Sequence, residues 1–182
     1  MMDEKILLWI RELKRYNSLL HLVGSGMIST IQQDVEEMLP LLERISEPVI
    51  ADIGSGSGLP AIPCKVLHPA SRVVLIERSS KKCTFLRHTL DLMGMQAVEV
   101  LEADPLVEDI GTFDAVLSRS FSPLSTLGKT VLRILAQQGR FYYLFTGSKL
   151  PDLDPRLRLQ ELFTRNCPGY TLSLAVFRLT PR

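Results

Sequence analysis

Hydrophobic residues change their spacing repeatedly along this chain, and the changes predict alternating helices and strands. From residue 3 to about residue 20 they recur at the helical period with charged residues between them, which predicts an amphipathic helix. A second helix is predicted from about 29 to 45, with a bend at Pro40. Short apolar runs bounded by turn residues then predict strands at 48–50, 71–77, 97–101, 113–118, 141–145 and 170–179. Further helices are expected at 61–67, 81–93, 124–135 and 156–164.

This alternation predicts an α/β fold with a mostly parallel, doubly wound sheet whose two faces are covered by helices. The two leading helices run into the first strand without a linker, so we expect residues 1–47 to form an N-terminal helical cap. Residues 48–182 would then form the core, and the whole chain, 1–182, a single domain.

The run 51–60, which reads Ala-Asp-Ile-Gly-Ser-Gly-Ser-Gly-Leu-Pro, follows the first predicted strand and leads into a helix. Glycine at positions 54, 56 and 58 lets the backbone turn sharply and approach a ligand closely, because no side chain stands in the way. A strand, a glycine turn and a helix start are together typical of the nucleotide-type cradle at the carboxyl end of a first strand.

The spacing of these glycines distinguishes between cofactors. A dinucleotide fingerprint needs a glycine at its sixth position, which Leu59 occupies here. Glycines at alternate positions after Asp52 instead resemble the S-adenosylmethionine loop of Rossmann-like methyltransferases. Glu77 ends the next predicted strand, about twenty residues on, where a carboxylate can accept both ribose hydroxyls. The alternative is an ordinary turn and a solvated strand end, and the combination of features favours a cofactor site.

Composition limits the possible classes of protein. The chain carries 21 basic and 20 acidic side chains, so no global attraction to nucleic acid is expected, although a local basic patch remains open. Its cysteines and histidines are scattered without the spacing of metal ligands, so we expect no metal site. We recognise no signal peptide and no apolar run long enough to span a bilayer. The expected location is cytoplasmic, with no membrane partner.

Several motifs in the stretch 49–146 occur together in one known family. They are the glycine loop with Gly58-Leu59-Pro60 and Ile62-Pro63, Leu75-Ile76-Glu77-Arg78-Ser79, Lys81-Lys82 with Phe85-Leu86-Arg87, Ala103-Asp104, and the run 113–121 containing Ser118-Arg119. Ahead of them, Tyr16-Asn17 matches a pair near the end of the family's first helix. On these residues the chain resembles the ribosomal RNA small subunit methyltransferase G family (glucose-inhibited division protein B).

The resemblance implies a class I S-adenosylmethionine-dependent methyltransferase fold whose final strand enters antiparallel. It also implies methyl transfer from S-adenosylmethionine to the seven-position nitrogen of a guanine in small-subunit ribosomal RNA. That nitrogen carries an in-plane lone pair and no proton, so the reaction needs alignment rather than a general base. We therefore assign no catalytic residue. The expected partner is small-subunit ribosomal RNA or the ribosomal particle, and we expect a monomer.

The loop and the resemblance together predict the site residues. For the cofactor they are Asp52, Gly54, Gly56, Gly58, Leu59, Glu77, Ala103, Asp104 and Arg119. For the substrate they are Arg119, Arg78, Lys81 and Lys82. Arg119 could hold the cofactor carboxylate or an RNA phosphate through its planar fork. The alternatives are a plain loop acid for Asp104, a surface arginine for Arg119, and a solvated helix face for the lysines.

The chain also departs from the family pattern. His21-Leu22-Val23 stands where the family has Asn-Leu-Thr, only Asp34 remains of a His-x-x-Asp-Ser element, and Thr146-Gly147 replaces Lys-Gly. Ala61 follows Gly58-Leu59-Pro60 where the family has a fourth-position glycine, and the tail after Lys149 is short. Two alternatives therefore stay open: a methyltransferase of the same fold acting on another RNA or a small molecule, and a catalytically silent cofactor-binding relative.

Overall fold

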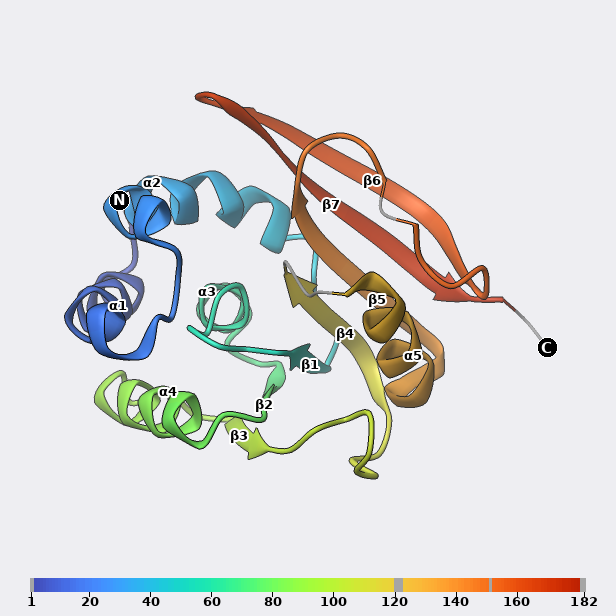
Figure 1. Cartoon of the computed structure of the whole chain (residues 1–182), viewed down its shortest axis with the longest axis horizontal. Helices are drawn as coiled ribbons and strands as arrows, with labels where there is room; N and C mark the ends of the chain where they lie inside the picture. Colours follow the sequence, from blue (N-terminus) through green and yellow to red (C-terminus); the bar gives the residue numbers. More distant parts are fainter. Residues whose placement is uncertain (1, 120–122, 151, 181–182) are drawn as a thin grey trace.

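The computed structural model describes residues 2–119, 123–150 and 152–180, and in this part of the chain seven strands form one sheet (Figure 1). The strand order is β3-β2-β1-β4-β5-β7-β6. Strands β1 to β5 pair in parallel, whereas β7 enters antiparallel between β5 and β6. Their bounds are β1 Val49–Ile53, β2 Arg72–Glu77, β3 Val98–Glu102, β4 Phe113–Arg119, β5 Leu135–Thr146, β6 Leu157–Cys167 and β7 Tyr170–Leu179. The predicted parallel sheet and antiparallel final strand are confirmed.

Helices cover both faces of the sheet unequally. Helices α1, α2, α3 and α4 lie on one side and α5 on the other (Figure 1). Their bounds are α1 Glu4–Leu20, α2 Ser25–Leu42, α3 Ala61–Leu67, α4 Ser80–Leu92 and α5 Leu124–Ile134. Trp9 of α1 and Val35 of α2 are fully buried in the same cluster as Ile50 of β1. The helical cap thus shares its hydrophobic core with the sheet.

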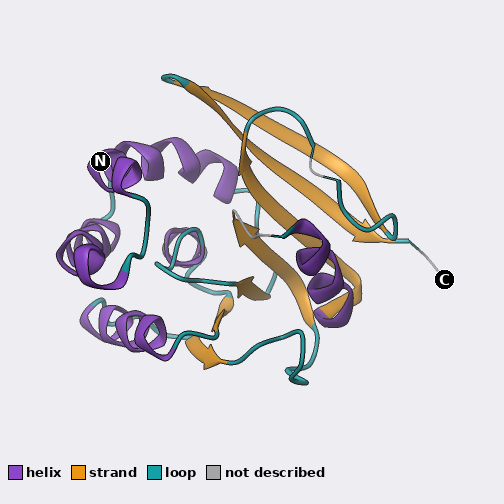
Figure 2. Ribbon diagram, viewed as in Figure 1, coloured by secondary structure: helices purple, strands orange, loops and turns teal. Residues whose placement is uncertain are grey.

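The predicted helix at 156–164 is wrong, because this segment forms strand β6. Its residues include good helix formers, but β7 presents an open hydrogen-bonding edge, and Gly169 (φ 85°) allows the hairpin between the two strands. A shift in register between Leu159 and Glu161 interrupts the alternation of side chains that would have marked a strand. The resulting long hairpin forms one edge of the sheet (Figure 2).

Other boundaries differ by a few residues. Helix α2 begins at Ser25, directly after Gly24. Strand β5 begins at Leu135 rather than at 141, so Gln137, Gln138 and Gly139, which we expected to end the preceding helix, already belong to the sheet. Gly139 lies within it, where a Cβ atom would approach the Asp114 carbonyl oxygen to 2.9 Å. The glycine is therefore explained by the close approach of β4 rather than by a turn.

Helix α1 is attached to the glycine loop by one buried hydrogen bond. The indole Nε1 of Trp9, which is inaccessible to solvent, donates to the carbonyl oxygen of Ser57 at 2.8 Å. Asp3 caps the helix by accepting from the Lys5 N–H at 2.8 Å. The helical cap therefore binds the glycine loop through Trp9 and also packs on the sheet.

Replacing Trp9 with phenylalanine should destabilise the protein and loosen the loop. Trp9→Phe keeps an aromatic ring but leaves the buried Ser57 carbonyl unpaired, which costs about 1–3 kcal/mol in the free energy of unfolding. Urea denaturation measures the cost, and hydrogen exchange of the amides at 54–58 reports on the loop. Tyr142→Phe is the matched control, since it removes a bond to Glu47 Oε1 (2.7 Å) far from the loop. Equal exchange rates in the two variants would contradict the proposed attachment.

Candidate cofactor site

The glycine loop lies on the end of β2. The N–H groups of Gly54 and Ser55 donate to the carbonyl oxygen of Ile76 at 2.9 and 3.1 Å, and the Gly58 N–H closes the turn on Ser55 at 2.7 Å. Gly54, Gly56 and Gly58 all have positive φ, at 69°, 51° and 87°. The predicted sharp turn is present at the carboxyl end of β1.

The three glycines serve different purposes. A Cβ atom at Gly58 would lie 2.4 Å from Cδ1 of Ile62, so this glycine permits close packing of the loop on α3. A Cβ atom at Gly56 would meet only the Gly54 carbonyl oxygen, at 3.6 Å. The open side of the loop at Gly56 faces a cavity, whereas Gly58 is buried away from it.

Two adjacent cavities follow the carboxyl ends of the strands. The first, of about 310 Å³, lies between the glycine loop and the α1–α2 connection and is called the loop cavity here. The second, of about 490 Å³, lies beside Ala103 and Asp104 after β3 and is called the edge cavity. Both are lined by Gly54, Glu77 and Lys82. The two cavities therefore form one groove that passes the end of β2.

Glu77 occupies the centre of this groove and is almost fully buried. Its Oε2 accepts the Gly56 N–H at 3.0 Å and its Oε1 accepts the Ser79 N–H at 2.8 Å. A carboxylate has about four acceptor positions, so two more donors can be accommodated. Glu77 thus holds the loop in place and still has the capacity expected for two ribose hydroxyls.

Asp52 lies beneath the loop and does not line either cavity. Burial, reinforced by the charge of Glu77, raises the pKa of the Asp52 carboxyl to about 7. Its Oδ2 is buried without a hydrogen-bond partner among the residues that the structure describes. A buried carboxylate oxygen without a partner is costly, and the raised pKa reflects this cost, because burial favours the neutral carboxyl group.

Ala103 and Asp104 line the edge cavity together with Arg78. Asp104 Oδ1 accepts the Leu106 N–H at 3.0 Å, which fixes the turn after β3 and leaves the other carboxylate oxygen available. Leu59, a predicted cofactor residue, lines the loop cavity and is otherwise buried. The predicted cofactor residues therefore line both parts of the groove, Ala103 and Asp104 on one side and Leu59 on the other.

Arg119 extends from the end of β4 into the loop cavity. Its Nη2 lies 3.2 Å from Sδ of Met27, and burial lowers the pKa of its guanidinium while the carboxylate of Asp34 opposes this shift. Asp34 accepts hydrogen bonds from the Tyr170 hydroxyl at 2.7 Å and the Thr30 hydroxyl at 2.8 Å. Arg119 is thus a partly buried cation facing the groove rather than a freely solvated side chain.

The predicted substrate-binding cations are divided between two places. Arg78 lines the edge cavity and Lys82 lines both cavities, so these two lie within the cofactor groove. Lys81 lines a separate groove between α1 and α4. Adjacent lysines on α4 therefore face different cavities.

The connection between α1 and α2 forms a wall of the loop cavity that the sequence reasoning missed. Leu22, Val23 and Met27 line it. Asn17 fixes this connection, since its Oδ1 accepts the Val23 N–H at 2.8 Å and its carbonyl accepts the His21 N–H at 2.9 Å. The Tyr16-Asn17 pair was a signal for this wall, because an asparagine near a helix end often binds the following backbone.

Strand order, the antiparallel β7 and a glycine loop beside an acidic strand end together define a Rossmann-like class I methyltransferase. Solved structures agree with this class. A mutant of MtNAS in complex with S-adenosylmethionine has a TM-score of 0.67 and 15% identity, over 96% of this chain and 73% of that one. The PH0226 protein from Pyrococcus horikoshii has the same TM-score and identity, over 93% of this chain and 99% of its own.

A sequence profile described as rRNA small subunit methyltransferase G matches residues 2–154. Curated proteins named ribosomal RNA small subunit methyltransferase G are also similar. The one from Polynucleobacter asymbioticus is 34% identical over 72% of this chain and 64% of its own length. The one from Helicobacter hepaticus is 28% identical over 85% of both chains. The chain belongs to the rRNA small subunit methyltransferase G family, as its motifs predict.

The family and fold make S-adenosylmethionine the cofactor of this groove, and the residues present fit it. Gly56 gives close approach and Glu77 supplies acceptors, whereas Asp52, a predicted cofactor residue, lies beneath the loop and lines neither cavity. Residues 2–119, 123–150 and 152–180 contain no cluster of potential metal ligands. Within the same ranges, none of the helices has the length and apolar character needed to cross a membrane.

A branched side chain at Gly56 should abolish cofactor binding. Gly56→Val places its side chain on the open side of the loop, where the ligand must approach, and strains a backbone with φ of 51° by about 1–3 kcal/mol. Gly94→Val is the matched control, because Gly94 has φ of 59° and open space around it at the end of α4. Calorimetry should show normal S-adenosylmethionine affinity in Gly94→Val only; binding by both variants would contradict the assignment.

Removing the Glu77 carboxylate should weaken binding of S-adenosylmethionine, because the ribose hydroxyls lose their acceptor. Glu77→Ala removes a charged acceptor worth about 1.5–3 kcal/mol, a loss of roughly ten- to a hundredfold in affinity. The alanine variant also frees the Gly56 N–H, so a cofactor analogue lacking the ribose hydroxyls is the necessary comparison. Wild type should prefer the natural cofactor strongly and the variant weakly. An undiminished preference in the variant would place the ribose elsewhere.

Proposed function

We propose that this chain transfers a methyl group from S-adenosylmethionine to the seven-position nitrogen of a guanine in small-subunit ribosomal RNA. The observation that carries the proposal is the match of the family profile over residues 2–154, which includes every residue placed in the groove. The alignments span 64% and 85% of the lengths of the first two curated relatives. Because one of them is matched over less than two thirds of its length, the activity of this chain is a proposal.

The lining of the loop cavity suits a reaction that depends on alignment. Its described residues include no histidine or cysteine, and its charged members are Glu77, Lys82 and Arg119. The guanine nitrogen attacks with its own lone pair, so the chain's task is to place that atom in line with the methyl group. S-adenosylmethionine supplies the methyl group as an activated sulfonium substituent. The protein supplies the orientation of both partners and excludes water between them.

Arg119 is proposed to bind an anion at the reacting end of the groove. Its guanidinium is partly buried, points into the loop cavity and lies near Asp34, which helps to keep it charged. Either the cofactor carboxylate or a phosphate flanking the guanine could accept its planar fork. Both roles place Arg119 close to the methyl group. In the first role the arginine lowers the KM for the cofactor, and in the second it lowers the KM for RNA.

One departure from the family pattern lies in the groove itself. Val23 lines the loop cavity, where an apolar side chain stands in place of the family's threonine, whereas Leu22 beside it keeps the family's leucine. Thr146, in place of lysine, lines neither cavity. The groove therefore retains its cofactor residues while its substrate side has changed, which is consistent with a divergent family member. We further propose that it acts as a monomer in the cytoplasm, since one chain supplies both cavities.

Purified protein should methylate small-subunit RNA with a steep dependence on salt. Phosphate contacts release counterions, so activity should fall as salt is raised, and mapping should locate 7-methylguanine at one site that is lost when the gene is removed. Methylation of free guanosine without salt dependence would favour a small-molecule enzyme instead. Cofactor binding without turnover on either substrate would indicate the catalytically silent relative.

Loss of Arg119 should lower kcat/KM, whereas loss of an exposed arginine elsewhere should not. Arg119→Ala removes a charge-assisted contact of about 1.5–3 kcal/mol, a loss of roughly ten- to a hundredfold in kcat/KM. A raised KM for cofactor would assign the arginine to the cofactor carboxylate, and a raised KM for RNA to a phosphate. Arg158→Ala, on the exposed outer strand β6, is the control and should behave as wild type. Comparable losses in both variants would rule out a local role.

A further inference from the structure

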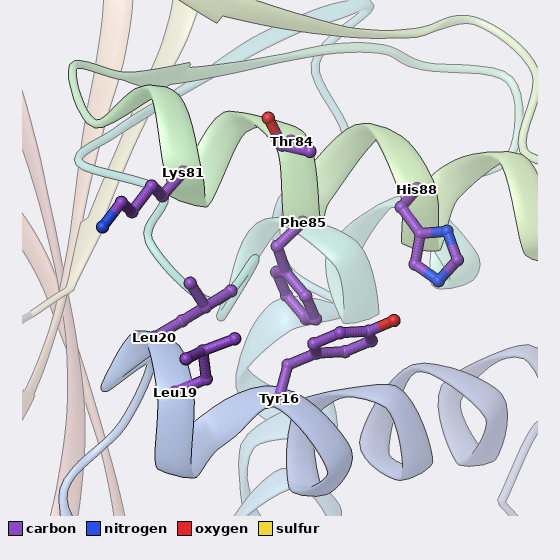
Figure 3. A pocket seen from close by; sticks show the side chains of 7 residues that line it. All are labelled: Tyr16, Leu19, Leu20, Lys81, Thr84, Phe85 and His88. Carbon is purple, nitrogen blue, oxygen red and sulfur yellow. The ribbon is translucent and has the colours of Figure 1, made fainter.

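A second groove lies between α1 and α4 (Figure 3). It has a volume of about 500 Å³ and is called the α1–α4 groove here. Tyr16, Leu19 and Leu20 project from α1 toward α4, and Phe85 projects from α4 toward them (Figure 3). None of its lining residues lines the two cofactor cavities, so the cofactor does not explain this groove.

The lining combines flat aromatic rings with exposed apolar surface. Phe85 is buried, and its ring centroid lies 6.0 Å from that of Tyr16 at an angle of 65°. The His88 ring lies 5.8 Å from Tyr16 at 80°. Leu19, at the rim, is 73% exposed. Apolar and aromatic surface left open in this way is typical of a site that another molecule covers.

Charge around the groove is one-sided. No acidic residue occurs between positions 13 and 33 or between positions 78 and 90, the two segments that form the groove. Of the basic side chains in these segments, Lys81 lines the groove itself. Arg78 and Lys82 line the neighbouring cofactor cavities, and Arg87 pairs with Glu102 at 3.5 Å. Glu12, just before the first segment, is buried and interacts with His88 at 3.2 Å and Arg15 at 3.9 Å. The surface at the groove therefore carries a cation and no exposed acid from these two segments, although the whole chain has a net charge of only +1.

The α1–α4 groove and the cofactor site are separate cavities lined by neighbouring residues of the same two segments. Lys81 lines the α1–α4 groove, and the next residue, Lys82, lines both cofactor cavities. On the other side Leu20 lines the groove, and Leu22, two residues later, lines the loop cavity. A strand of nucleic acid entering the loop cavity would therefore reach the groove within a short distance.

We propose that the α1–α4 groove holds an unpaired RNA base that neighbours the methylated guanine, with its phosphate against Lys81. Single-stranded RNA is bound by aromatic side chains that contact the base and by cations that follow the backbone, which is the combination present here. An apolar groove alone would fit a protein helix equally well, but Lys81 in its lining and the lack of acidic residues in the segments 13–33 and 78–90 favour RNA. The proposal rests on the proposed function, because it names a subsite for that substrate.

Variants at the rim test the subsite without touching the cofactor groove. Tyr16→Ala should weaken binding of small-subunit RNA roughly five- to a hundredfold, the loss expected for one stacked base. Tyr16→Phe keeps the ring and should retain the affinity. Leu19→Glu places a negative charge beside the phosphate and should weaken RNA binding at least as much. Leu92→Glu is the matched control, since Leu92 is also exposed (51%) but lies at the far end of α4.

Two measurements separate the outcomes. Filter binding with RNA gives the substrate affinity, and calorimetry with S-adenosylmethionine gives the cofactor affinity, which should be unchanged in every variant. If wild type methylates the RNA but Tyr16→Ala and Leu19→Glu bind it normally, the subsite is wrong and the proposed function stands. If wild type neither binds nor methylates RNA, the proposed function fails and the subsite with it. Variants that lose affinity for assembled subunits and not for free RNA would point to a protein occupant and overturn the proposal.

Discussion

The arrangement of the site depends on the two hydrogen bonds that the Glu77 carboxylate accepts from the backbone. They join the glycine loop after β1, through Gly56, to the start of the α4 segment, through Ser79. A backbone with three positive-φ glycines has many accessible conformations, and a buried acceptor fixed at the end of a central strand selects one of them. The same residue that limits the loop also faces the groove. Loop geometry and ligand recognition are therefore coupled through a single side chain.

The helical cap adds a second constraint from the opposite side. Trp9 holds the Ser57 carbonyl, and Asn17 holds the connection at Val23. The glycine loop and the α1–α2 connection, which both line the loop cavity, are consequently each tied by a hydrogen bond to helix α1. This arrangement explains why a short helical segment ahead of the first strand belongs to the site. It also brings the residues at the end of α1 close to the loop cavity.

The sequence predicted most of the fold because its signals were local. Alternating apolar runs located the parallel strands, and the glycine loop with Glu77 located the groove. Strand β6 was missed because its pairing depends on the distant edge of β7 and its alternation is broken at Gln160. The division of Lys81 from Lys82 was also beyond the sequence, since neighbouring positions on a helix face directions about 100° apart and only the packing of α1 shows what each one meets. The role of Gly58 in packing against Ile62 was likewise hidden in an apparently uniform glycine repeat.

Strand β6 leaves one long edge of the sheet without a neighbouring strand among the residues that the structure describes. Such an edge offers unpaired backbone groups to any other extended chain, and it is a common starting point for intermolecular sheet growth. Here the edge carries Arg158, Glu161 and Arg165, and a register shift distorts it. Arg165 is further drawn toward α2 by its ion pair with Glu37. The charges and the distortion oppose the pairing of another extended chain along this edge, although Leu159 and Leu162 leave apolar surface exposed on the same strand.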